Sequence, residues 1–193
     1  REEGAKLHEL IETHQVIDLG RSGLGSLQRW FDLLNERLSG AVKQEGRHYV
    51  TYEFYLLASA DPASWVYKHQ QAGAQHSRGH VFMTTGLIAR MLETLGVKNA
   101  ADIIPERTEQ VLEGLAGIAA HEFAHPKQDE LIKWDMRAGQ GWALPAVQFD
   151  EAATDWLALR LLARAGLPRR ALLTGLGLIY GKRPADGYAV RSV

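Results

Sequence analysis

The amino-acid sequence predicts an α+β fold that is mainly helical and carries a small β-sheet. Two runs rich in aromatic and β-branched residues, 48–57 and 79–86, are typical of strands. Most of the other segments place apolar residues at the i, i+3, i+4 spacing of amphipathic helices. At 193 residues the chain is long enough for one domain with its own core. No run approaches the ~18 consecutive apolar residues of a membrane-spanning helix.

The N-terminal part predicts two helices followed by a strand. Residues 1–20 mix charged and apolar side chains and are expected to be helical. Ser26 can cap a second helix, which ends near Gly46 and has an apolar stripe of Leu27, Trp30, Phe31, Leu34 and Leu38. The strand 48–57 follows. The polar stretch 59–78 contains turn signals and is expected to be irregular.

The second half predicts a strand and then a series of helices. The strand 79–86 leads into a helix that stops at Gly96, and Pro105 suits the first turn of the next helix. In that helix Gly114 and Gly117 would let a neighbouring element approach closely.

Pro126 is expected to end this helix near His125, because a proline disfavours helical geometry in the residue before it. An irregular stretch to about Gln148 then precedes helices over 149–165 and 168–180. The sequence therefore predicts helices both before and after the two strands along the chain.

Composition and charge exclude several classes of function. Lys and Arg number 22 against 23 Asp and Glu, a net charge of −1, so the basic excess typical of nucleic-acid binding is absent. The lack of cysteine excludes disulfide scaffolds and thiol catalysis, and any transition metal would need His and carboxylate ligands. Because the chain begins at Arg1, we expect it to be a processed or trimmed piece, with any membrane association arising from a segment outside it.

The residues that carry chemistry are His121-Glu122-Phe123-Ala124-His125, an H-E-x-x-H pattern on the predicted helix. Positions i and i+4 lie on one helical face, so both imidazoles can reach a single metal ion. Zinc accepts imidazole nitrogens and leaves a position for water in catalytic sites. Glu122 projects beside the pair, where it can take a proton from a water molecule at the metal. The alternative is an ordinary helix with two packed or exposed histidines.

A third ligand is found downstream in Glu151-Ala152-Ala153-Thr154-Asp155. Glu151 and Asp155 are again i and i+4 on an apolar helix. Glu151 can complete a His, His, Glu site for one zinc ion per chain. Asp155 can accept the free ring N–H of His121 and thereby fix its tautomer. Alone, such a carboxylate pair is more often a solvated helix face, but beside H-E-x-x-H the metal interpretation is favoured.

These motifs resemble those of gluzincin metallopeptidases. The string from Phe149 to Pro168 is similar to the E-x-E-A-D … L-L-x-x-A-G-x-x-P helix of the CAAX prenyl protease/HtpX-like family, which includes periplasmic members of the BepA type. Residues 79–87 are similar to that family's G-x-I-x-V-x-x-G-L unit.

The resemblance implies a zincin-like metallopeptidase domain whose active-site cleft is rimmed by the edge strand of the sheet. That rim would bind an extended or unfolded polypeptide through His80, Val81, Phe82 and Met83. The resemblance also favours a periplasmic or other extracytoplasmic location in a bacterium. We expect a single domain over 1–193, with an N-terminal helical region 1–47, a catalytic core 48–180 and a tail 181–193.

One departure from the family concerns transition-state stabilisation. The family's late H-P … R element has no match, since the chain has no His after His125. Tyr188 is the candidate oxyanion stabiliser, with Tyr180 or a late arginine as alternatives; a further expectation is that the chain is cut before this element.

Two other groups of residues are weaker candidates. The histidines His69, His76 and His80 could hold a second metal, although scattered histidines in a polar stretch are common. Trp134 and Trp142 could line a substrate pocket or be buried in packing.

The leading functional hypothesis is a zinc-dependent endopeptidase with Glu122 as its base. The alternatives are a non-catalytic, zinc-stabilised interaction or chaperone-like module, and a helical protein without metal. Metal content and peptide turnover separate the three.

Overall fold

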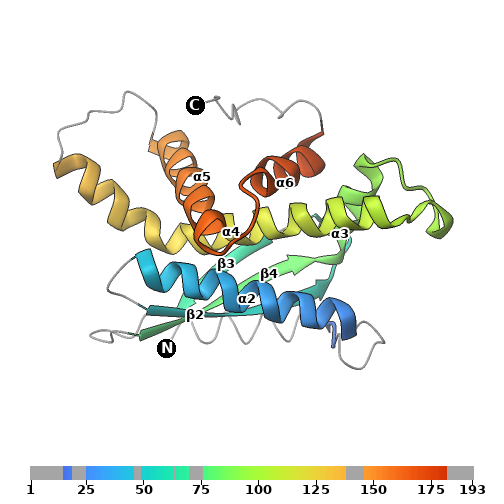
Figure 1. Cartoon of the computed structure of the whole chain (residues 1–193), viewed down its shortest axis with the longest axis horizontal. Helices are drawn as coiled ribbons and strands as arrows, with labels where there is room; N and C mark the ends of the chain where they lie inside the picture. The colour runs from blue at the N-terminus through green and yellow to red at the C-terminus, as the bar shows by residue number, and fades with distance from the viewer. Residues whose placement is uncertain are drawn as a thin grey trace.

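The computed structural model describes residues 15–18, 25–45, 49–62, 64–69, 76–137 and 146–181. Its strands are β1 (Gln15–Val16), β2 (Tyr49–Ala58), β3 (Ser64–His69) and β4 (His76–Thr84). Its helices are α2 (Gly25–Glu45), α3 (Thr85–Thr94), the short 3₁₀ helix η1 (Ala100–Asp102), α4 (Pro105–Arg137), α5 (Ala146–Arg164) and α6 (Arg170–Tyr180). The α+β class is confirmed (Figure 1).

The strands form one sheet in the order β1-β2-β4-β3. β2 and β4 are parallel, whereas β1 and β3 are antiparallel to their neighbours. A short turn after β2 carries the chain past the end of β4, so that β3 lies on the far side of β4 from β2. Among the described strands, β4 is therefore an inner strand and β3 is an edge strand.

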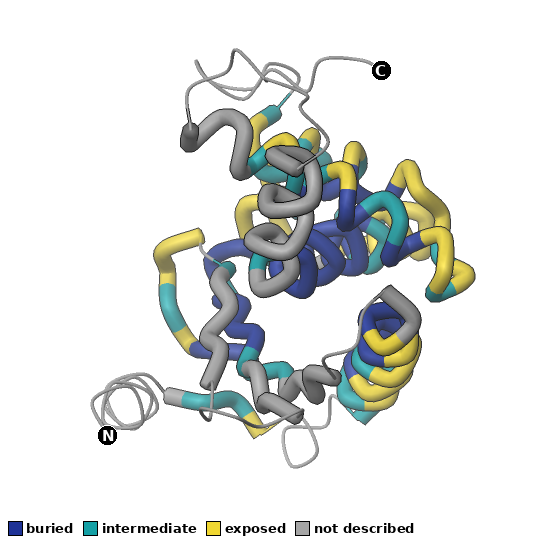
Figure 2. The backbone as a smooth tube through the Cα atoms, turned by 90° about the vertical axis from the view of Figure 1, so that its left-hand side faces the viewer, coloured by how far each residue is buried: buried dark blue, intermediate teal, exposed yellow. Residues whose placement is uncertain are grey.

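The helices cover the sheet in two layers. α2 packs on β2, α4 contacts β3 and β4, and α5 and α6 pack on the side of α4 away from the sheet (Figure 1). The buried positions of these elements face the interior, and the exposed positions of α2 lie on its outer side (Figure 2). The central rings are Phe31, Phe54 and Phe123, from α2, β2 and α4, with centroids 5.6 Å apart at each step.

The predicted stripe of α2 is confirmed, since Phe31, Leu34 and Leu38 are buried. The predicted close approach at Gly114 and Gly117 is confirmed as well. A Cβ added to Gly117 would lie 2.1 Å from the carbonyl oxygen of Ala171, so α4 and α6 are in backbone contact there. This contact places α6 firmly on α4.

Two predictions for the N-terminal half are wrong. Gln15 and Val16 form a strand, not part of a helix over 1–20, because they pair with Ala58 and Leu57 of β2; residues 1–14 lie outside the described part. The stretch 59–78 is not irregular throughout, since β3 and the start of β4 lie in it. β3 is stabilised by backbone hydrogen bonds to β4. This pairing cannot be deduced from the polar residues on either side of β3.

Two predictions about the end of the motif helix are also wrong. α4 does not stop near His125 but continues through Pro126 to Arg137, and α5 begins at Ala146, so residues 126–137 and 146–148 of the expected irregular stretch are helical. A proline inside a helix costs about 3 kcal/mol through its missing N–H and its ring. Packing of α4 against α5 and α6 offsets this local preference.

One cluster of buried side chains draws on α2, β2, β4 and the helices α3, α4, α5 and α6. Within the described helices, none is both long and apolar enough to cross a membrane.

Candidate metal centre

The H-E-x-x-H motif lies in the middle of α4, a helix that packs against β3 and β4 and also against α5 and α6. Ala120, Phe123 and Ala124 are fully buried in the core. His121 and His125 lie one turn apart, and their ring centroids are 4.6 Å apart with the planes nearly perpendicular. The apolar residues of the motif thus anchor the helix, and the two imidazoles project together from it.

α5 brings a carboxylate to these imidazoles. One ligand atom each from His121, His125 and Glu151 lie within 4.8 Å of one another, a grouping that can hold a metal ion. Thr154, Ala158 and Leu161 of the same helix are fully buried, which fixes α5 against its neighbours. The sequence-predicted ligands are therefore brought together.

The donor set fits a transition metal held by nitrogen and oxygen. In a tetrahedral site with bonds of 2.0–2.2 Å, two ligand atoms are about 3.3–3.6 Å apart. His121 Nε2 and Glu151 Oε2 are separated by 3.3 Å. Two imidazoles and one carboxylate also match a ligand set found in catalytic zinc sites.

Asp155 contacts His121 as predicted. His121 Nδ1 and Asp155 Oδ1 are 2.8 Å apart, which directs Nε2 of the same ring toward Glu151. Burial alone would lower the pKa of His121, but the hydrogen bonds to Asp155 and Glu151 and the nearby negative charges outweigh it and raise this pKa to about 9. A cation at Nε2 is therefore favoured, whether it is a proton or a metal ion.

Glu122 is buried beside the ligands but is not one of them. Only 6% of Glu122 is exposed, and burial raises the pKa of its carboxyl although His121, a hydrogen bond and His125 act in the opposite direction. That hydrogen bond comes from Ser64, whose Oγ donates to Glu122 Oε1 over 2.9 Å. Sequence reasoning missed Ser64, because no local pattern links it to Glu122, which lies 58 residues later in the chain.

Neither a scan against protein-family models nor a search of curated proteins gives a match for this chain.

The expected substrate strand is corrected by the sheet topology. The strand that contains His80 to Met83 was predicted to rim the cleft, but β4 is hydrogen-bonded to β2 on one side and to β3 on the other. Val81, Phe82 and Met83 are fully buried, and His80 packs against the rings of Tyr55 and Phe82. A strand paired on both sides has no free backbone groups for a peptide. β3, which contacts α4, is the edge next to the metal centre.

The other candidates are placed only in part. Tyr180 ends α6; partial burial raises its pKa, and the charges of Glu151, Asp155 and Glu122 raise it further, so the phenol lies within their electrostatic reach. Outside the described residues or side chains lie Tyr188, Trp142, Trp134, His69 and His76.

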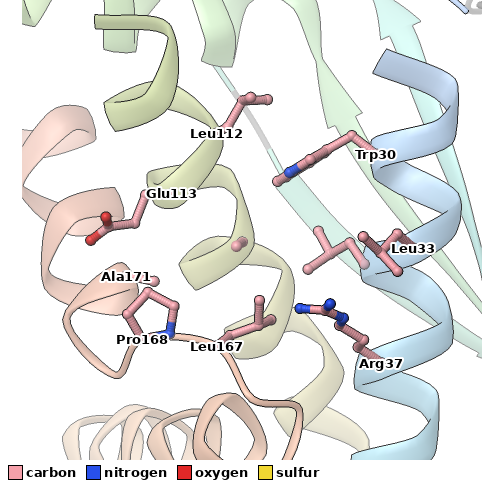
Figure 3. A pocket seen from close by; sticks show the side chains of 10 residues that line it. Trp30, Leu33, Arg37, Leu112, Glu113, Leu167, Pro168 and Ala171 are labelled. Carbon is pink, nitrogen blue, oxygen red and sulfur yellow. The ribbon is translucent and has the colours of Figure 1, made fainter. Parts of the chain in front are cut away.

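A separate hollow of about 190 Å³ lies between α2 and α4 (Figure 3). Its walls are mostly apolar and include Trp30, Leu112 and Leu167, and it shares no residue with the metal centre. Glu113 at its edge is directed away, toward α6, where it pairs with Arg170 over 2.9 Å. The hollow therefore brings no reactive group to the metal centre.

Proposed function

We propose that this chain is a zinc-dependent endopeptidase of the gluzincin kind, related to the CAAX prenyl protease/HtpX-like peptidases. His121, His125 and Glu151 would hold one zinc ion, and Glu122 would be the general base. The observation that carries the proposal is a buried carboxylate next to a His, His, Glu cluster but outside it. A site that only stored metal would have no need of this additional desolvated acid.

When bound, zinc would polarise the peptide carbonyl and make a nearby water molecule more acidic. The residues of the chain move the protons. As the water oxygen forms a bond to the carbonyl carbon, Glu122 accepts a proton from that water. When the C–N bond breaks, Glu122 returns this proton to the leaving nitrogen, so that a new carboxyl group and a new amine result. Burial supports this role, because it raises the pKa of Glu122 and makes it a stronger base.

The substrate in this proposal is an extended or unfolded polypeptide that adds to β3. An edge strand offers unpaired N–H and C=O groups to a peptide, and main-chain hydrogen bonds supply affinity without requiring one sequence. β3 supports this role because it is the edge strand that contacts α4, and its first residue touches the base.

The second candidate function is a non-catalytic, zinc-stabilised interaction module. It is favoured by the absence of any His after His125, which leaves the resembling family's late H-P … R element unmatched. Such a module would bind zinc through the same three ligands but would not hydrolyse peptides.

The experiment is a comparison of wild type with Glu122→Gln. Gln has nearly the same shape but cannot accept the proton, so zinc content should stay at one per chain while cleavage of an unfolded protein falls by at least ~10²-fold. Glu109→Gln, on the exposed face of the same helix, is the matched control and should behave as wild type. Zinc-loaded wild type that cleaves no unfolded protein would favour the interaction module.

A further inference from the structure

We propose that Ser64 is a positioning residue for Glu122, which holds the base from the edge strand rather than from the helix that carries it. This inference rests on the proposed peptidase function. In this proposal β3 has two roles: it would bind the substrate, and through Ser64 it orients Glu122, which activates the water.

The contact between Ser64 and Glu122 is the first observation. Ser64 Oγ donates to Glu122 Oε1 over 2.9 Å and joins the start of β3 to the middle of α4. Glu122 is buried, and a buried carboxylate without donors is costly. Among the described residues, none donates a hydrogen bond to its other oxygen, Oε2. One oxygen is thus held, and the other is left to accept a proton.

The turn that precedes Ser64 is the second observation, because it is fixed to the end of β4 and the start of α3. Four hydrogen bonds make this connection: Thr84 Oγ1 to the carbonyl of Asp61 (2.6 Å), Thr85 Oγ1 to the carbonyl of Ser59 (2.9 Å), the Ser59 N–H to Thr85 Oγ1 (3.2 Å), and the Gly86 N–H to the carbonyl of Ser59 (2.8 Å). Thr84 also caps α3 by accepting from the N–H of Leu87. The segment leading to Ser64 is therefore held by the framework of the fold.

Gly86 shows how closely the turn is seated. A Cβ added at this position would lie 2.3 Å from the carbonyl oxygen of Ala60, a distance that real Cβ atoms do not adopt. Only glycine lets the turn approach the helix this far. Backbone contacts thus fix the turn before Ser64 against the end of β4 and the start of α3, which restrains the Ser64 hydroxyl that donates to the carboxylate.

A positioning role predicts a specific kinetic pattern. Loss of the hydroxyl should let the Glu122 carboxylate rotate away from the attacking water, while the zinc ligands and the backbone of β3 stay in place. Misplacement of this kind affects the transition state more than substrate binding. Ser64→Ala should therefore lower kcat and leave KM and zinc content at their wild-type values.

The experiment measures kcat, KM and zinc content of the zinc-loaded full chain on an unfolded protein substrate. Ser64→Ala is expected to lower kcat by about 10- to 100-fold. Ser64→Thr keeps a hydroxyl and suits a strand, so it should restore most of kcat. In the Glu122→Gln background, Ser64→Ala should change nothing further. Ser39→Ala, which removes a buried hydroxyl bonded to Asn35 on α2, is the matched control.

Two outcomes would overturn the inference, and they are distinguishable. In the first, wild type cleaves the substrate, but Ser64→Ala either has the wild-type kcat or lowers kcat by the same factor in the Glu122→Gln background as in wild type. Ser64 then does not act through Glu122, and the peptidase proposal stands. If zinc-loaded wild type itself has no turnover, the peptidase proposal fails and the positioning role fails with it.

Discussion

Replacement of Asp155 by asparagine is expected to weaken metal binding and leave the fold intact. Asp155 Oδ1 lies 2.8 Å from His121 Nδ1, and this contact turns the ring so that Nε2 faces Glu151. Asparagine has the same shape, and its carbonyl oxygen can accept the same hydrogen bond. It lacks the negative charge that makes the imidazole a better ligand for a cation.

The magnitude follows from the role of Asp155 as a partner of a ligand. Loss of such partners typically costs 10- to 100-fold in metal affinity, which is about 1.4 to 2.8 kcal/mol. Asp155→Ala removes the acceptor as well as the charge and should lie at the upper end. Asp155→Asn should lie at the lower end, because it retains the hydrogen bond.

The pH dependence gives a second measure of the same interaction. The pKa of His121 is raised to about 9 without metal, so zinc must displace a proton and its affinity should rise about tenfold per pH unit up to about pH 9. The raised pKa also stabilises the metal-free fold by at most about 3 kcal/mol. This stabilisation is complete below the ordinary pKa of 6.5 and is lost as the pH rises through about 9. In Asp155→Asn the pKa of His121 should be lower. Zinc affinity should therefore stop rising at a lower pH, and the stabilisation of the metal-free fold should be lost at a lower pH.

The assay is a zinc titration against a competing chromophoric chelator at a series of pH values. Circular dichroism and thermal unfolding of the metal-free proteins report the fold. Asp32→Asn, an exposed change on α2 where Gln28 donates to the carboxylate, is the control and should bind zinc as wild type does. Unchanged affinity and unchanged pH dependence in both Asp155 variants would refute a role for this residue at the metal.

Three further predictions concern the ligands, the packing and the transition state. Glu151→Ala should lose zinc, measured as metal content after dialysis, and full occupancy would contradict its assignment as a ligand. Gly117→Ala should destabilise the fold by about 1–3 kcal/mol in denaturant unfolding, because its Cβ would meet the Ala171 carbonyl, whereas Gly177→Ala in open space should not destabilise it. Tyr180→Phe should lower kcat with unchanged zinc content if the phenol steadies the developing oxyanion, and an unchanged kcat would exclude it.

Several features that depend on neighbours in the sequence were predicted correctly. The stripe of α2, the entry into α3 at Gly86 and the start of α4 at Pro105 are properties of short segments. The i, i+4 spacing of His121 and His125 places both rings on one helical face whatever surrounds the helix. For the same reason Glu151 and Asp155 could be assigned as a pair before their position relative to the histidines was known.

Features that depend on distant partners were decided only by the tertiary structure. Packing of α5 on α4 brings Glu151 Oε2 to 3.3 Å from His121 Nε2, and no spacing in the sequence sets that distance. Packing also carries α4 through Pro126 against its local preference. Which strand is an edge depends on how the strands pair, so the sequence predicted an edge at β4, whereas the structure has β3 at the edge. The hydroxyl of Ser64 reaches Glu122 for a similar reason: the pairing of β3 with β4 and the hydrogen bonds of the preceding turn to Thr84 and Thr85 place it there.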